Sequence, residues 1–110
     1  MDVKLLAKAL DEAKETAYKG VVRPVEGTIL TVIKDIAAQA EVSAQRTSIF
    51  TEVLADIVEA AEASVERTPS LLPILEQAGV VDSGGKGLLC IFEGMWRFIN
   101  GDPLDKAITE

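Results

Sequence analysis

Histidine is absent from this 110-residue chain, and cysteine occurs once, at Cys90. No internal disulfide can form, and a zinc cluster of cysteine and histidine ligands is excluded. The chain also lacks the run of about 18 apolar residues that a membrane-spanning helix needs, and its start has no basic segment followed by an apolar core. We therefore expect no membrane insertion, no secretory signal and a cytoplasmic location. Cys90 lies in the apolar stretch Leu88-Leu89-Cys90-Ile91-Phe92, so we expect it to be a buried, unreactive thiol.

Basic residues are scarce as well: 11 lysines and arginines stand against 18 aspartates and glutamates, a net charge of −7. This field disfavours nucleic acid as a partner, and it would repel a nucleoside triphosphate unless cations or a helix terminus screened the phosphates. Hydrophobic residues nevertheless make up 48% of the chain. Because a small domain has little interior, part of this apolar surface is expected to face a partner.

Apolar residues recur at steps of three and four, which predicts helices at residues 2–22, 28–41, 48–67, 70–78 and 87–99. Asp2 and Thr28 stand where N-caps belong, and Gly79 stands where a helix ends in left-handed geometry. The last helix is expected to bury Leu88, Phe92, Met95 and Ile99. Residues 80–86 would connect the last two helices, and residues 102–110 would form a short helix or a frayed end. No stretch alternates with period two, so we predict an all-α fold, an antiparallel bundle of about five helices.

The glycine-rich segment Asp82-Ser83-Gly84-Gly85-Lys86-Gly87 leads into the last predicted helix. Glycine in a helix costs about 1 kcal/mol relative to alanine, so the segment needs a reason. It is either a sharp turn, capped by Asp82 or Ser83, that allows close helix packing, or a bare backbone that a ligand approaches. The carboxylate of Asp82 would repel phosphate and suits a ribose hydroxyl or an exocyclic amine. The spacing is not that of a P-loop, and Lys86 lies either near a phosphate or in solvent.

A second segment, Arg23-Pro24-Val25-Glu26-Gly27-Thr28-Ile29, delivers a Gly-Thr pair to a helix start and by itself predicts only an N-cap at Thr28. Three stretches then occur in order: Pro-Val-Glu-Gly-Thr-Ile-Leu-Thr-Val, Thr-Pro-Ser-Leu-Leu-Pro-Ile-Leu and Ala-Gly-Val-Val-Asp-Ser-Gly-Gly-Lys-Gly-Leu. Together they resemble the DhaL-like domain of the dihydroxyacetone kinase superfamily, most closely its fatty acid kinase A-type branch.

This resemblance extends from Ala17 to Ile99 and implies an antiparallel eight-helix barrel that holds ATP or ADP with Mg²⁺ at one end. It places six residues near the adenine and ribose: Gly27, Thr28, Ile29, Asp82, Ser83 and Gly84. The family's metal-binding aspartates and phosphate-binding Gly-Asn-Ser-Gly-type segment would precede the start of this sequence. Residues 1–110 are thus expected to be the C-terminal part of a DhaL-like nucleotide-binding domain, an incomplete barrel without catalytic or metal-binding residues of its own.

The resemblance therefore implies a parent ATP-dependent kinase that phosphorylates an acyl group held by a fatty-acid-binding partner protein. Since phosphoryl transfer depends on positioned metal ions, this chain alone is expected to be inactive and to bind no nucleotide without the missing N-terminal part of the domain. Its open apolar helix faces are expected to form a homo-oligomer. Two alternatives remain: a dihydroxyacetone-type kinase acting on a small ketose, and a non-catalytic helical interaction module. The module would use the apolar stripes and the acidic face of the third helix, which carries Glu52, Asp56, Glu59, Glu62 and Glu66.

Overall fold

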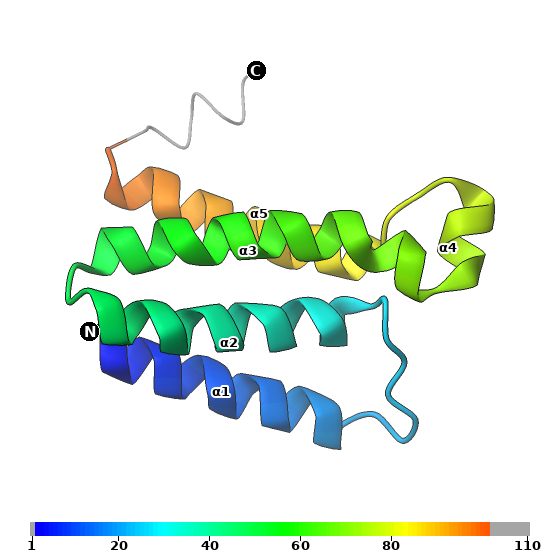
Figure 1. Ribbon diagram of the computed structural model, residues 1–110, viewed down its shortest axis with the longest axis horizontal. Helices are drawn as coiled ribbons and strands as arrows, with labels where there is room; N and C mark the ends of the chain where they lie inside the picture. The colour runs from blue at the N-terminus through cyan, green and yellow to red at the C-terminus, as the bar shows by residue number, and fades with distance from the viewer. Residues whose placement is uncertain (1, 102–110) are drawn as a thin grey trace.

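The computed structural model describes residues 2–101, and within that range it contains five helices and no strand (Figure 1). The helices are α1 (Val3–Lys19), α2 (Ile29–Arg46), α3 (Phe50–Leu71), α4 (Pro73–Ala78) and α5 (Ser83–Ile99). The four long helices run in alternating directions along the molecule, and α4 projects at one end (Figure 1). The predicted all-α antiparallel bundle is confirmed, while the tail at 102–110 lies outside the described residues.

The predicted helix caps are confirmed. Asp2 accepts a hydrogen bond from the N–H of Leu5 at 2.7 Å, and Thr28 accepts one from the N–H of Leu30 at 3.3 Å. Gly79 ends α4 with φ 70°, a left-handed conformation that glycine adopts without a steric penalty. Asp2 and Thr28 thus accept hydrogen bonds from free N–H groups at the starts of α1 and α2, and Gly79 ends α4, each at the predicted position.

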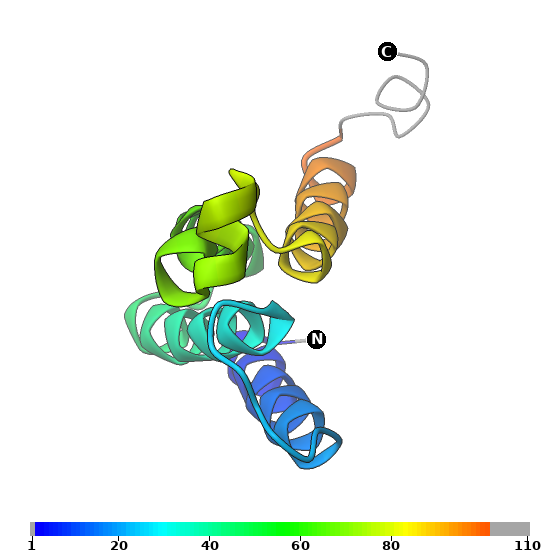
Figure 2. The ribbon, with the colours of Figure 1, turned by 90° about the vertical axis from the view of Figure 1, so that its right-hand side faces the viewer.

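The core lies around α2 and α3, which supply its fully buried side chains. α1 packs on α2, and α5 packs on both α2 and α3, so α1 and α5 lie on different sides of the central pair (Figure 2). The largest fully buried apolar side chains are Val32, Ile36, Val53, Leu54 and Ile57. Truncating Ile36 or Leu54 to alanine should cost about 2–5 kcal/mol, because the packed surroundings would close only partly around the cavity.

Two reciprocal polar contacts fix the register of α2 against α3. Asp35 of α2 accepts hydrogen bonds from Ser64 and Arg67 of α3, at 2.7 and 2.6 Å. Asp56 of α3 accepts from Ser43 of α2 at 2.7 Å and also pairs with Arg46 of α2. Each helix therefore presents one aspartate and one Ser-x-x-Arg pair to the other. We call these two contacts the aspartate clasps.

Helix α3 runs through Pro69 to Leu71, so the predictions that it ends at residue 67 and that the next helix begins near residue 70 are wrong. Proline has no N–H to donate to the carbonyl four residues earlier, which here belongs to Val65. The hydroxyl of Thr68 donates to that carbonyl at 2.7 Å instead. Thr68 thereby replaces the missing donor and lets the helix pass through Pro69.

Other predicted boundaries shift for local reasons. Helix α1 ends at Lys19 rather than residue 22, with Gly20 as its C-cap, and α2 continues to Arg46 rather than residue 41. The extension of α2 carries Ser43 and Arg46, which complete the contact with Asp56 on α3. Tertiary hydrogen bonds thus lengthen α2 beyond what its apolar periodicity indicated.

Helix α5 begins at Ser83, so the prediction of a connector at 80–86 and a helix from residue 87 is wrong. Leu89 and Phe92 are buried and Leu88 is half-buried, but Met95 and Ile99 are 39% and 43% exposed. Cys90 is exposed as well, contrary to prediction. The reason is that, among residues 2–101, α5 is covered on one side only, by α2 and α3, and these side chains lie around the rest of the helix.

Candidate functional site

The two glycine-bearing segments meet at one end of the bundle. Gly84 lies against the first residue of α2: a Cβ added to Gly84 would stand 3.4 Å from Cβ of Ile29. At Gly85 an added Cβ would stand 2.8 Å from Cγ2 of Val32, closer than side chains tolerate. The start of α5 can therefore approach the start of α2 only because Gly85 has no side chain.

The end of α3 closes a third side of this junction. Gly27 has φ 87°, and a Cβ on it would lie 2.7 Å from Cβ of Leu72 and 2.9 Å from the carbonyl oxygen of Thr68. The N–H of Gly27 donates to the buried hydroxyl of Thr31 at 2.9 Å. Both the backbone conformation and the space at this position therefore require glycine.

Thr68 connects the end of α3 to the start of α5. Its side chain is fully buried, and its hydroxyl accepts a hydrogen bond from the N–H of Asp82 at 3.0 Å while donating to Val65. The sequence stretches 24–32, 68–75 and 78–88 consequently converge in space. The structure brings the two predicted segments, 27–29 and 82–84, to one junction, where Gly84 lies against Ile29 while Gly27 is buried against the end of α3.

Asp82 and Thr28 both serve as helix caps at this junction. Oδ2 of Asp82 accepts from the N–H of Gly85 at 2.9 Å, and Thr28, besides capping α2, donates to the carbonyl of Val25 at 2.7 Å. The prediction that glycines of the segment 82–87 allow close helix packing under an Asp82 cap is therefore correct at Gly85, although residues 83–87 are helical and not a turn. Within residues 2–101, Oδ1 of Asp82 makes no hydrogen bond, and Ser83, Gly84 and Ile29 are exposed beside it. One surface thus combines a free hydrogen-bond acceptor on Asp82, the N–H groups at the start of α5 and the apolar side chain of Ile29.

Sequence reasoning missed a polar cluster that holds the turn before α2. Glu26 accepts a hydrogen bond from Tyr18 of α1 at 3.2 Å and forms an ion pair with Lys34 of α2. The hydrogen bond from Lys34 lowers the pKa of Glu26, and Glu26 in turn raises the pKa of Lys34. The cluster fixes the chain directly before Gly27. Its only signal in the sequence is that Tyr18 and Lys34 each stand eight residues from Glu26.

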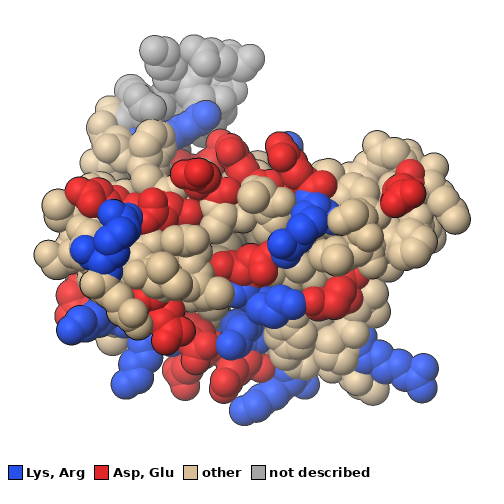
Figure 3. All heavy atoms as spheres, viewed as in Figure 1, with Lys and Arg blue, Asp and Glu red and all other residues tan. Residues whose placement is uncertain are grey.

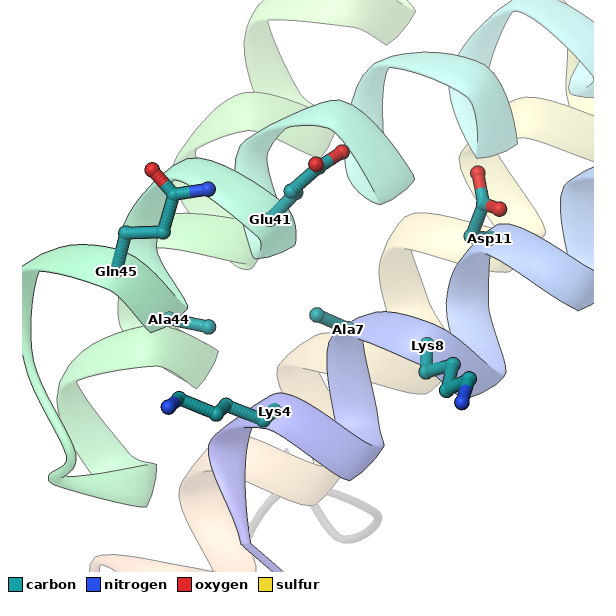
Figure 4. Close-up of a pocket in the computed structure, with 7 residues that line it drawn as sticks. All are labelled: Lys4, Ala7, Lys8, Asp11, Glu41, Ala44 and Gln45. Atoms are coloured by element: carbon teal, nitrogen blue, oxygen red, sulfur yellow. The ribbon is translucent and has the colours of Figure 1, made fainter.

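Three surface hollows lie away from this junction. One, of about 370 Å³, lies between α1 and α2 and is lined by Lys4, Ala7, Lys8, Asp11, Glu41, Ala44 and Gln45 (Figure 4). The other two lie at the start of α1 and along the face shared by α2 and α3. None of the six predicted site residues lines any of the three. Charges of both signs are interspersed over the face in Figure 3, and Lys86 is exposed in the first turn of α5.

Residues 2–101 contain no group of three acidic or cysteine side chains placed to hold a metal ion. No helix among them combines the length and apolarity needed to cross a bilayer.

Comparison with known proteins gives one family and a set of longer relatives. The DAK2 domain family matches residues 1–97. The chain is 47% identical over 107 residues to uncharacterized proteins of Staphylococcus aureus strains RF122, USA300 and N315. Each alignment covers 97% of this chain but 20% of the relative, so the chain spans about a fifth of the length of the curated relatives it matches.

Proposed function

Because this chain belongs to the DAK2 domain family, the DhaL-like domains of the dihydroxyacetone kinase superfamily, we propose that it forms the nucleoside-binding wall of an ATP-dependent kinase domain of the fatty acid kinase type. Other parts of such a protein would supply the metal-binding residues. The kinase would phosphorylate an acyl group presented by a fatty-acid-binding partner protein, as the resemblance of the three stretches implies.

The observation that carries this proposal is the contact of Gly84 with Ile29, which joins the two glycine-bearing segments on one surface. A nucleoside offers hydroxyl and amine donors and a flat apolar ring. Oδ1 of Asp82 would accept from a ribose hydroxyl or the adenine amine, while Oδ2 keeps its bond to Gly85. Ile29, 43% exposed, offers an apolar contact for the ring. The N–H groups of Ser83 and Gly84 belong to the unsatisfied first turn of α5 and are available as donors.

Magnesium does not fit the residues described here, since residues 2–101 contain no cluster of ligands for it. We therefore assign no metal-dependent step to this chain. When bound, Mg²⁺ neutralises the charge that develops on the transferring phosphoryl group, and an acidic chain of this kind needs that screening to hold a triphosphate. The contribution proposed for this chain is to bind and orient the nucleoside end.

The test joins this chain to the N-terminal segment of a DAK2 protein and measures ADP binding with Mg²⁺ by calorimetry. The Asp82→Ala variant should bind roughly 2- to 12-fold more weakly, the loss of one hydrogen bond at about 0.5–1.5 kcal/mol. The same loss is expected for Thr28→Val, because the Thr28 hydroxyl donates to Val25 and accepts from Leu30 but keeps one lone pair that would accept from the nucleoside. Both residues are also N-caps, so the matched control is Asp2→Ala, which removes the cap of α1 through the same kind of bond to Leu5. ADP affinities of Asp82→Ala and Thr28→Val that equal the affinity of Asp2→Ala would refute the site.

A further inference from the structure

Helix α5 carries a second apolar face that is largely exposed among residues 2–101, with only its first residue, Gly84, lying against Ile29. Gly84, Gly87, Ile91, Gly94 and Phe98 follow one another at steps of three, four, three and four. Ile91 is 61% and Phe98 is 69% exposed. We call these five residues the outer seam of α5, because the buried residues Leu89 and Phe92 lie on a different side of the helix. In Figure 2, α5 stands apart from α1, with one side turned away from α2 and α3.

Two glycines of the outer seam have no explanation within the described chain. A Cβ on Gly87 or on Gly94 would meet nothing within 4 Å, and neither residue has a positive φ. Each therefore lowers helix stability, by about 1 kcal/mol relative to alanine, without relieving a clash or strain. A repeat that averages 3.5 residues is the pattern of a helix that packs along another helix. Small residues on such a seam leave holes that large side chains of the partner helix fill.

We propose that a second copy of this chain covers the outer seam, with the two α5 helices packed antiparallel about a twofold axis. Antiparallel pairing sets Phe98 on the partner subunit's Gly87, and it sets Ile91 on the partner subunit's Gly94. By symmetry the same two layers occur again, so that every layer combines one large residue with one glycine. Parallel pairing would set phenylalanine on phenylalanine and glycine on glycine, which leaves overpacked and empty layers.

Charge favours α5 over α3 for this contact. The outer seam itself carries no charge, and α5 has Lys86 and Arg97 against Glu93. Helix α3 has one arginine against five acidic residues, so two copies would repel each other through that face. The seam from Gly84 to Phe98 is about 21 Å long. A helix pair of that length buries on the order of 1,000 Å² in total, the lower limit of a specific interface, and the expected dimer is micromolar in strength.

The experiment is sedimentation equilibrium of the full 110-residue chain over about 1 μM to 1 mM, the range in which such a dimer forms. Ile91→Ser should weaken dimerisation more than tenfold, while Val42→Ser, which alters a side chain of α2 with nearly the same exposure, 62%, should leave it unchanged. Gly94→Leu fills the hole and should also give monomers without loss of helix content in circular dichroism, since space around Gly94 is open. The double variant with Ile91→Gly and Gly94→Ile should dimerise again, because each layer still pairs a large residue with a glycine.

Orientation is tested by mixing two variants in a Cys90→Ser background, one with Gly87→Cys and one with Phe98→Cys. Antiparallel pairing should give a disulfide between the two different chains under mild oxidation. Disulfides only between identical chains would overturn the arrangement.

A chain that stays monomeric at 1 mM would overturn the proposal outright and would assign the seam to another part of a longer protein or to another protein. A dimer lost with Val42→Ser and kept with Ile91→Ser would place the interface elsewhere. No arm of this experiment contains nucleotide, so its outcome is separate from that of the nucleoside site.

Discussion

The backbone N–H of Asp82 donates a hydrogen bond to the buried hydroxyl of Thr68, 3.0 Å away, and this one bond links the start of α5 to the end of α3. The same hydroxyl donates to the carbonyl of Val65, which Pro69 cannot serve. Thr68 thus supports two features at once: the passage of α3 through a proline and the placement of the glycine-rich helix start against α2.

Replacing Thr68 by valine should destabilise the fold by about 1–3 kcal/mol, because it leaves the N–H of Asp82 and the carbonyl of Val65 without partners in a buried place. Urea unfolding followed by circular dichroism measures the loss. The amide of Asp82 should also exchange faster with deuterium. Thr51→Val is the control, since the hydroxyl of Thr51, on the same helix, bonds nothing among the described residues. Equal stabilities of the Thr68 and Thr51 variants would show that the two hydrogen bonds of Thr68 do not stabilise the fold.

Gly27 and Gly79 both have left-handed backbone conformations but differ in their surroundings. Alanine substitutions at the two positions therefore distinguish the cost of backbone strain from the cost of a steric clash. Gly79, with φ 70°, has nothing within 4 Å of an added Cβ, whereas at Gly27, with φ 87°, an added Cβ would lie 2.7 Å from Leu72. Gly79→Ala should cost about 1–2 kcal/mol from conformation alone, and Gly27→Ala should cost more, because the turn must also move away from the end of α3. Thermal unfolding of both variants checks the order. A Gly27→Ala variant as stable as Gly79→Ala would mean that the turn does not pack on α3.

The glycines of α5 should respond to alanine with opposite signs. At Gly85 the added methyl group would meet Val32 at 2.8 Å, so Gly85→Ala should destabilise the bundle by about 1–3 kcal/mol through overpacking. At Gly87 the space is open and the residue is helical, so Gly87→Ala should stabilise it by up to about 1 kcal/mol. Unfolding at low protein concentration, where any dimer has dissociated, isolates these effects. Destabilisation by both changes would contradict the distinction.

The sequence predicted the helices of the bundle, the caps at Asp2, Thr28 and Gly79, and the grouping of the six candidate residues, because each depends on local periodicity, local hydrogen bonds or a motif. It failed where distant contacts decide. The residues around Pro69 do not indicate that the hydroxyl of Thr68 replaces the missing N–H donor and allows α3 to continue. The residues around Gly84 do not indicate that α2 packs against the glycines and that α5 begins at Ser83. Cys90 was misjudged because an apolar run does not reveal which side of a helix is covered.

The aspartate clasp at Asp56 should make stability depend on acid pH. The hydrogen bond from Ser43, and after it Arg46, lowers the pKa of Asp56 in the folded chain, whereas the unfolded chain keeps the ordinary value of about 3.9. A lowered folded pKa gives stability that is complete above the unfolded value and is lost as the pH falls through the folded one. The free energy of unfolding, measured with urea from pH 7 to pH 2, should therefore fall below about pH 5 by more in the parent than in Asp56→Asn. Glu62→Gln, which neutralises an exposed carboxylate on the same helix, should follow the parent. If Asp56→Asn also follows the parent across this range, the carboxylate of Asp56 does not hold α2 against α3.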